Sequence, residues 1–176
     1  MSKKALFLDR DGVINIEKNY LHKIEDFEFI DGIFELCRFF QSKDFDVFVV
    51  TNQSGIARAY YSEADFNILT NWMVDIFKQE DITIRHVYYC PHHPDISGAC
   101  SCRKPEPGMI NEALKSFDIN PEGSLLVGDK ERDIQAGQAA GLSYTYLFTE
   151  ENVDSSATKI VTNLRDIIKD FHDTSG

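Results

Sequence analysis

Two aspartates close to the start of the chain have a spacing that phosphoryl-transfer chemistry can use. Asp9 and Asp11 follow the apolar run Ala5-Leu6-Phe7-Leu8, and a single arginine separates them. Residues two apart in an extended segment lie on the same side of it. One carboxylate could therefore attack phosphorus to form an aspartyl-phosphate, while the other protonates the leaving oxygen. Gly12 would allow the tight turn that follows them.

Three later segments carry groups that bind phosphate. They are the runs Thr51-Asn52-Gln53-Ser54-Gly55, Cys102-Arg103-Lys104-Pro105 and Gly128-Asp129-Lys130. Thr51 and Asn52 can donate hydrogen bonds to phosphate oxygens. Arg103, Lys104 and Lys130 can do the same with the addition of positive charge. These segments therefore complement the two aspartates at the start of the chain.

The acidic residues predict a magnesium site. Asp9, Asp11 and Asp129 offer hard oxygen ligands, which Mg²⁺ prefers, and a metal with a lysine and a hydroxyl completes a phosphoryl-transfer set. The chain has 18 Lys and Arg against 29 Asp and Glu, a net charge of -11. A phosphorylated ligand would need the metal or local positive charge to overcome this excess. The same excess argues against nucleic acid or an anionic membrane as the main partner.

The elements between these residues must bring them together. Short apolar or aromatic runs predict strands at residues 4–8, 47–51, 86–90, 125–128 and 144–148. Helical patterns separate them, so we expect one three-layer α/β domain over residues 1–176, with helices on both faces of a parallel sheet. Polar strand ends then lie along one edge, where ligands bind. The short gaps between these elements leave no room for a large cap domain.

A loop rich in cysteine and histidine predicts a second metal site. Its CxH…CxC set consists of Cys90, His92, Cys100 and Cys102, with His93 as an alternative ligand. Three thiolates and one imidazole complete a tetrahedral Zn²⁺ site with no open position, which implies a structural ion. Such an ion would fix the loop and place Arg103 and Lys104 directly after it.

The composition also favours a location and a state of assembly. No segment is apolar over the length of a transmembrane helix, and the apolar run near the N-terminus is too short for a signal peptide. We therefore expect a cytoplasmic protein, and a monomer by default. Cysteines in that compartment stay reduced, which favours metal binding or burial over disulfides.

Four segments together resemble a known family. FLDRDG, VTNQSG, CRKP and VGDKERD are similar, in order and in spacing, to the four motifs of the haloacid dehalogenase (HAD) superfamily. The resemblance covers residues 4 to about 149. Stretches such as TNQSGIAR, YYCPHHP and VGDKERDIQAG narrow it to the D-glycero-D-manno-heptose 1,7-bisphosphate 7-phosphatases. Histidinol-phosphate phosphatases share the DxD and a similar cysteine loop and are the main alternative. A catalytically silent binding module of the same fold is an alternative of a different class.

The resemblance implies a role for each site residue. Asp9 would be the nucleophile and Asp11 the general acid/base, with Mg²⁺ held by Asp9, the Asp11 main-chain carbonyl and Asp129. Thr51 and Lys104 would steady the phosphoryl group during transfer. The expected substrate contacts are Glu17, Lys18, Asn19, Tyr20, Asn52, Gln53, Ser54, Arg103 and Lys130. The nearby Asp133 could support the site or stabilise the start of a helix.

Two short stretches depart from the family pattern. Lys18-Asn19-Tyr20 stands where relatives commonly carry His-Gly-Tyr, and Ala59 stands where glycine is usual. Both lie near the expected pocket, so they concern the preferred sugar or anomer rather than phosphoryl transfer. The implied activity is Mg²⁺-dependent removal of the 7-phosphate, which would supply heptose for a bacterial surface polysaccharide.

Overall fold

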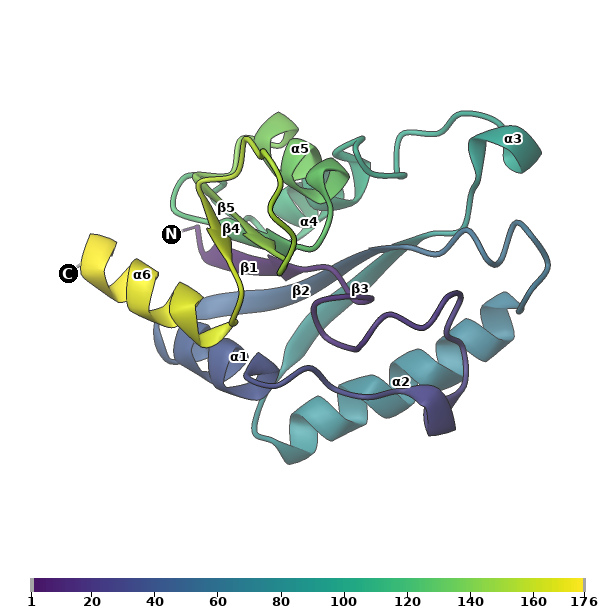
Figure 1. The fold of residues 1–176 in the computed structure, drawn as a ribbon, viewed down its shortest axis with the longest axis horizontal. Helices are drawn as coiled ribbons and strands as arrows, with labels where there is room; N and C mark the ends of the chain where they lie inside the picture. The colour runs from purple at the N-terminus through teal and green to yellow at the C-terminus, as the bar shows by residue number, and fades with distance from the viewer. Residues whose placement is uncertain (1, 176) are drawn as a thin grey trace.

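The computed structural model describes residues 2–175, in which six strands form one parallel sheet (Figure 1). The strands are β1 (Lys4–Leu8), β2 (Phe45–Asn52), β3 (Ile84–Cys90), β4 (Leu125–Gly128), β5 (Tyr144–Phe148) and β6 (Lys159–Val161). Their order is β3-β2-β1-β4-β5-β6, and every neighbouring pair is parallel. The chain order therefore reverses between β1 and β4. Ligands bind at such a reversal, beyond the carboxyl ends of the strands.

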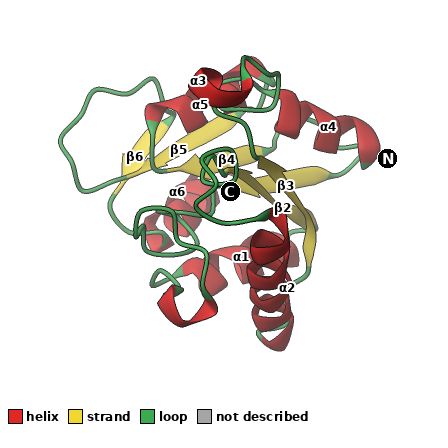
Figure 2. Cartoon of the chain, turned by 90° about the vertical axis from the view of Figure 1, so that its right-hand side faces the viewer, coloured by secondary structure: helices red, strands yellow, loops and turns green. Residues whose placement is uncertain are grey.

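Helices cover both faces of the sheet (Figures 1 and 2). One face carries α1 (Ile33–Ser42), α2 (Glu63–Gln79) and α6 (Arg165–Ser175), and the other carries α4 (Gly108–Ser116) and α5 (Glu131–Ala139). The short α3 (Pro94–Ser97) and a 3-10 turn, η1 (Ile24–Asp26), lie in connecting loops. The arrangement confirms the three-layer α/β architecture that the alternating pattern predicts.

Strand β1 illustrates why the sheet needs helices on both sides. Leu6 and Leu8 pack in the apolar cluster that includes α1 and α2, whereas Ala5 and Phe7 pack in the cluster that includes α4 and α5. All four side chains are fully buried. Burial of a leucine or phenylalanine side chain stabilises the fold by roughly 1.5–3 kcal/mol. This core fixes the strand whose end carries the first aspartate of the site.

The strand bounds agree closely with the sequence pattern. The strands expected at 4–8, 125–128 and 144–148 have those bounds, while β2 and β3 each begin two residues earlier than expected. Strand β6 was not predicted. It has three residues at an edge of the sheet, two of them exposed, and is too short to show a periodicity.

The loops beyond the carboxyl ends of the strands contain no helix larger than the turn η1 and the short α3. Across residues 2–175 no segment forms an inserted cap domain, as expected. Within the same range, no helix combines the length and the apolar character that crossing a bilayer requires.

Candidate active site

Asp9 and Asp129 meet at the point where the strand order reverses. They directly follow β1 and β4, which pair with Leu8 opposite Val127. The Asp9 main-chain N–H donates to the Val127 carbonyl at 3.1 Å, which continues the ladder into the site. Carboxylate oxygens of Asp9, Asp129 and Asp133 all lie within 4.8 Å of one another. The sheet thus gathers three acidic side chains, of which the first two were predicted as metal ligands.

The ammonium group of Lys104 lies between two of these carboxylates. Its Nζ is 3.0 Å from Asp9 Oδ1 and 2.7 Å from Asp133 Oδ1, and it donates to the Val50 carbonyl at 2.9 Å. Burial alone would lower the pKa of Lys104, but the charges of Asp133 and Asp9 outweigh burial and raise it. The lysine is therefore a permanent positive charge beside Asp9.

Asp133 serves both the helix and the site. Its Oδ2 accepts from the main-chain N–H groups of Asp129 and Lys130, each at 3.1 Å, which satisfies free donors at the start of α5. Its Oδ1 faces Lys104. The two roles between which the sequence left a choice are therefore combined in one buried carboxylate.

One ammonium does not neutralise three carboxylates, of which Asp9 and Asp133 are buried and Asp129 is partly buried. Burial raises the pKa of Asp9 well above its usual value, and the charge of Asp133 raises it further. Burial and then Asp133 also raise the pKa of Asp129 to about 6. Burial would raise the pKa of Asp133 too, but the ion pair with Lys104 outweighs it and lowers that pKa. This surplus of negative oxygen donors is the chemistry that suits Mg²⁺.

Two glycines give these carboxylates their space. A Cβ atom on Gly12, whose φ is +89°, would lie 2.1 Å from Asp129 Oδ2. A Cβ atom on Gly128 would lie 2.2 Å from the Cβ of Asp133. Real Cβ atoms do not approach other atoms so closely, and L-residues rarely adopt the φ of Gly12. The acidic cluster therefore requires glycine at both positions.

Asp11 is not part of the acidic cluster and lines the adjoining cavity. Its Oδ1 accepts from Arg10 Nη2 at 2.9 Å and from Asn15 Nδ2 at 3.0 Å, and its Oδ2 accepts from Gln53 Nε2 at 3.1 Å. Both oxygens are thus held by the protein. The metal role expected for Asp11 consequently rests on its main-chain carbonyl.

Gln53 connects Thr51 to Asp11. Its Nε2 donates to Thr51 Oγ1 at 2.8 Å as well as to Asp11, and its Oε1 accepts from the Tyr61 hydroxyl. The Tyr61 ring stacks on His22, with ring centroids 5.1 Å apart. Because Thr51 and Gln53 are both buried, this network orients the two expected catalytic side chains.

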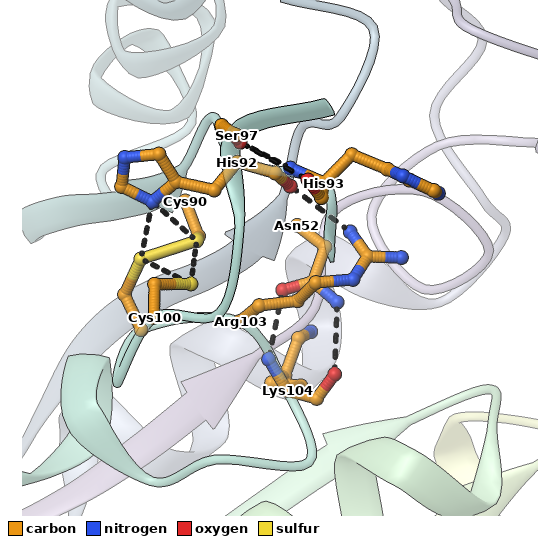
Figure 3. Close-up of a disulfide and its surroundings, with 9 residues drawn as sticks. Asn52, Cys90, His92, His93, Ser97, Cys100, Arg103 and Lys104 are labelled. Atoms are coloured by element: carbon orange, nitrogen blue, oxygen red, sulfur yellow. Dashed lines mark hydrogen bonds between the residues drawn. A yellow bond between two sulfur atoms is a disulfide. The ribbon is translucent and has the colours of Figure 1, made fainter. Parts of the chain in front are cut away.

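Asn52 holds the main chain of Lys104 from both sides (Figure 3). Its Oδ1 accepts from the Lys104 N–H at 3.0 Å, and its Nδ2 donates to the Lys104 carbonyl at 3.3 Å. The end of β2 thereby fixes the segment that delivers the buried lysine. Asn52 also lines the cavity beside Asp11.

A cavity of about 280 Å³ adjoins Asp11, and most of the expected substrate contacts form its walls. These are Glu17, Asn19, Tyr20, Asn52, Gln53, Ser54 and Arg103. Two other expected contacts lie elsewhere: the Lys18 ammonium pairs with Glu28, and Lys130 is exposed outside the cavity wall. Four further side chains on the wall, those of Arg58, Tyr61, His93 and Arg132, were not among the expected substrate contacts. Three of the four, Arg58, His93 and Arg132, stand within the matched stretches GIAR, PHHP and DKERD.

Cys90, at the end of β3, gathers in one cluster with two cysteines and a histidine of the loop that follows (Figure 3). The ligand atoms of Cys90, His92, Cys100 and Cys102 lie within 4.8 Å of one another. His92 Nδ1 is 3.5 Å from Cys90 Sγ and 3.3 Å from Cys102 Sγ, and Cys100 Sγ is 3.5 Å and 3.6 Å from the same two atoms. Ligand atoms around a tetrahedral zinc ion lie roughly 3.3–3.8 Å apart. The donor set and its spacing therefore fit Zn²⁺.

One feature of this cluster departs from the expectation that all four cysteines are reduced. Cys90 and Cys102 are joined by a disulfide, while Cys100 and the buried Cys37 are free. A zinc ligand must be a thiolate, so the disulfide and a bound zinc ion are alternative states of the same residues. His92, rather than His93, belongs to the cluster.

Comparisons with known proteins agree with this site. Residues 101–174 match the HAD-hydrolase-like family model. The D-glycero-alpha-D-manno-heptose-1,7-bisphosphate 7-phosphatase of Campylobacter jejuni is 48% identical over 171 residues, 97% of each chain. The D-glycero-beta-D-manno-heptose-1,7-bisphosphate 7-phosphatase of Escherichia coli K12 is 45% identical, covering 80% of this chain and 76% of that one.

A solved structure of a heptose bisphosphate phosphatase has the same fold as this chain. The D,D-heptose 1,7-bisphosphate phosphatase of B. bronchiseptica, complexed with magnesium and phosphate, superposes with a TM-score of 0.84 at 28% identity. The match covers 97% of this chain and 99% of that one. Because the likeness in sequence and in fold extends over nearly the whole chain, this protein belongs to the D-glycero-D-manno-heptose-1,7-bisphosphate 7-phosphatase family of HAD-like hydrolases.

Proposed function

We propose that the protein is a Mg²⁺-dependent phosphatase that removes the 7-phosphate of D-glycero-D-manno-heptose 1,7-bisphosphate through an aspartyl-phosphate. The observation that carries the proposal is the meeting of Asp9, Asp129 and Lys104 at one strand-order reversal, in a member of this family. Relatives named for the alpha and the beta anomer have similar identities, so both anomers belong in the test.

Asp9 is the proposed nucleophile. Lys104 Nζ and the Arg10 N–H both donate to its Oδ1, at 3.0 Å and 2.9 Å, and this fixes the orientation of the carboxylate. Attack on phosphorus forms an acyl phosphate and breaks the bond to the sugar oxygen. Water then attacks the acyl phosphate, which releases inorganic phosphate and restores Asp9.

Asp11 is the proposed general acid and base. It lines the cavity in which the sugar oxygen must leave, two residues from the nucleophile. It donates a proton to that oxygen in the first step and accepts one from the attacking water in the second. Gln53 and Arg10 hold its two oxygens in place, while Thr51 is oriented by the same glutamine.

Mg²⁺ would be held by Asp9 and Asp129, with the Asp11 main-chain carbonyl. When bound, it neutralises the surplus charge of the buried carboxylates and polarises the phosphoryl oxygens. Lys104 remains beside Asp9 as a second positive charge for the phosphoryl group.

Zn²⁺ would be held by Cys90, His92, Cys100 and Cys102, and its role would be structural. Arg103 and Lys104 follow the last ligand directly, so a fixed loop fixes both. One zinc ion per chain is expected in reduced protein, and elemental analysis together with a count of free thiols would detect it. A metal-free protein with the Cys90–Cys102 disulfide would contradict the zinc proposal.

The remaining part of the proposal concerns where the enzyme works. Thiolate ligands require a reducing compartment, which supports the cytoplasm. The residues proposed for catalysis, Asp9, Asp129 and Lys104, meet within one chain, so the reaction needs no residue of a second subunit and a monomer suffices. Light scattering during gel filtration would test the second point, and a dimer mass would overturn it.

The experiment that tests the function compares substrates. Phosphate release is measured from both anomers of the heptose bisphosphate and from histidinol phosphate, with Mg²⁺ and with a chelator. We expect the heptose bisphosphate to have the highest kcat/KM and ³¹P NMR to show loss of the 7-phosphate. Asp9→Asn should abolish the reaction while remaining folded, which its circular dichroism spectrum would show.

Two outcomes would count against the proposal. Faster hydrolysis of histidinol phosphate would replace the substrate but leave the mechanism standing. Equal rates for the parent and for Asp9→Asn on every ester would remove the proposed nucleophile, and a silent binding module would then be the better description.

A further inference from the structure

The hydroxyl of Tyr61 is a polar group at the cavity to which the proposed chemistry gives no part. Tyr61 lies in the loop between β2 and α2, is 7% exposed and forms part of the cavity wall. Its hydroxyl contacts the side-chain oxygen of Gln53, and the Gln53 nitrogen contacts Thr51 and Asp11. Tyr61 is therefore linked, through one amide, to two side chains that are proposed to act in catalysis.

The direction of each of these hydrogen bonds follows from Asp11. An ionised carboxylate can only accept, so the Gln53 amide must turn its nitrogen towards Asp11 Oδ2, which lies 3.1 Å away. The Gln53 oxygen then faces Tyr61, whose hydroxyl has to donate. Burial raises the pKa of Tyr61 to about 12, so the hydroxyl keeps the proton that this bond needs. Asp11 and Tyr61 thus require the same one of the two orientations of the amide.

The hydrogen-bond donors of Gln53 are all engaged within the protein. An amide nitrogen carries two hydrogens, and Gln53 Nε2 donates to Thr51 Oγ1 at 2.8 Å as well as to Asp11 Oδ2. The Thr51 hydroxyl in turn donates to the Asn52 carbonyl at 3.4 Å, a long contact that a phosphoryl oxygen can replace. Gln53 therefore has no N–H group left for the sugar and acts on Thr51 and Asp11 instead.

Two neighbours hold the Tyr61 ring in place. A Cβ atom on Gly55 would lie 2.2 Å from Tyr61 Cε1, closer than real Cβ atoms come to another atom. Gly55 does not have a positive φ, so the ring rather than the backbone requires glycine there. His22, from the loop after β1, stacks on the ring with an angle of 11° between the two planes. A ring that is packed so closely fixes the position of its hydroxyl.

We propose that Tyr61 is a positioning residue, whose hydroxyl fixes the Gln53 amide so that the amide sets Thr51 and Asp11 for phosphoryl transfer. The inference rests on the proposed function, because Thr51 and Asp11 have these roles only in that reaction. Since Tyr61 acts through Gln53, loss of its hydroxyl misplaces catalytic groups and leaves the contacts of the substrate intact. The effect should therefore appear in kcat rather than in KM.

The test removes the hydroxyl and keeps the ring. Tyr61→Phe is compared with Gln53→Met, whose side chain has a similar length but no amide, and with the double variant. Tyr60→Phe is the matched control, because it makes the same change at an adjacent tyrosine that is 55% exposed and is not a wall residue of the cavity. Both kcat and KM are measured on heptose 1,7-bisphosphate and on p-nitrophenyl phosphate in saturating Mg²⁺, and circular dichroism checks that each variant is folded.

The expected losses differ between the variants. Tyr61→Phe should lower kcat by about 5- to 10-fold on both esters, with KM changed by less than about 2-fold, because one hydrogen bond to the amide is lost. Gln53→Met should lower kcat by about 100-fold, because it releases both catalytic side chains. The double variant should match Gln53→Met within about 2-fold, since Tyr61 has no effect on the reaction without the amide. Tyr60→Phe should behave as the parent does.

Each contrary result has a distinct meaning. An unchanged kcat in Tyr61→Phe would overturn the positioning role, and a rise in KM alone would overturn it by showing that Tyr61 binds the substrate. A loss in the double variant equal to the product of the two single losses would show that Tyr61 acts independently of Gln53, which also overturns the inference. These three results leave the proposed function standing. If the parent hydrolyses p-nitrophenyl phosphate but not the heptose bisphosphate, the proposed substrate fails, while the same variants on the aryl ester still decide the role of Tyr61.

Discussion

The ion pair between Lys104 and Asp133 offers a sharp test of how the site is built. Lys104 Nζ lies 2.7 Å from Asp133 Oδ1, and the two side chains are 2% and 1% exposed. Asp133→Asn keeps an oxygen that can accept from Asp129 and Lys130 but removes the charge. Removing one partner of a buried ion pair costs about 3–5 kcal/mol, because the other charge is left without compensation.

The surroundings place the expected value at the lower end of that range. In this variant Lys104 still has a second carboxylate partner, Asp9 at 3.0 Å, so its positive charge remains partly compensated. Asp133 also repels Asp9 and Asp129 and raises their pKa values, so removing its charge reduces this repulsion and offsets part of the loss in stability. Saturating Mg²⁺ neutralises that repulsion, and the measurement is therefore made with the metal present. We expect a loss of about 3 kcal/mol in the free energy of unfolding.

Urea unfolding followed by the fluorescence of Trp72, the single tryptophan, measures this loss. A loss of about 3 kcal/mol lowers the urea midpoint by at least about 1 M. Asp31→Asn is the matched control, because Asp31 forms an ion pair with Arg165 but its side chain is 86% exposed. The control should leave the midpoint unchanged within error. If Asp133→Asn in Mg²⁺ is as stable as the control, the buried pair does not hold the site together.

Three further predictions follow from the same structure. In metal-free protein the free energy of unfolding should fall as pH rises from about 4 to 6, because folded Asp129, whose pKa is raised to about 6, keeps a proton that the unfolded chain has lost. Asp129 alone should contribute about 3 kcal/mol to the fall, Asp9, whose pKa is also raised, should add to it, and a flat profile in a chelator would contradict the prediction. Gly12→Ala should weaken Mg²⁺ binding and lower kcat by about 100-fold, since the new Cβ atom would lie 2.1 Å from Asp129 Oδ2. Gly98 also has a positive φ, but a Cβ atom there would have no other atom within 4 Å, so calorimetry should find the Mg²⁺ affinity of Gly98→Ala unchanged. Ala59→Gly should stabilise the protein by about 0.5–1 kcal/mol, a rise of about 1–4 °C in the unfolding midpoint, because Ala59 has a φ of 60°. Ala140→Gly, at a helical φ of -81°, should instead lower the midpoint, and calorimetric scans of both variants would contradict the prediction if Ala59→Gly also lowered it.

The backbone conformation explains why two positions at which this chain departs from the family pattern usually carry glycine. Asn19 and Ala59 stand where relatives commonly carry glycine, and both have positive φ, 50° and 60°. The chain therefore keeps a glycine-like backbone at both positions with residues that adopt it at some cost. Asn19 lines the cavity, so its side chain adds a polar group that glycine lacks. The sequence showed the substitutions, but their conformations depend on contacts made by both loops.

Sequence reasoning was strongest where the signal is local. Strand β1 could be predicted because an apolar run bounded by Asp9 is typical of a strand that is buried on both faces. The cysteine cluster could be predicted because ligand type and spacing together specify a tetrahedral site. Lys18 and Lys130 were expected at the substrate from their place in the motifs, yet neither lines the cavity. The direction of a loop side chain depends on its neighbours, such as Glu28 for Lys18.

The amino-acid sequence by itself determined the chemistry available to this protein: paired aspartates, a lysine after a loop rich in cysteine and histidine, and strands that end in polar residues. Only the tertiary structure decided which of these groups touch. The pairing of Lys104 with Asp133, the hydrogen bonds of Asn52 to the Lys104 main chain, and the cavity beside Asp11 all join segments distant in sequence. Local preferences set the strands and helices, whereas contacts of this kind depend on how the sheet order and the loops bring separate elements together.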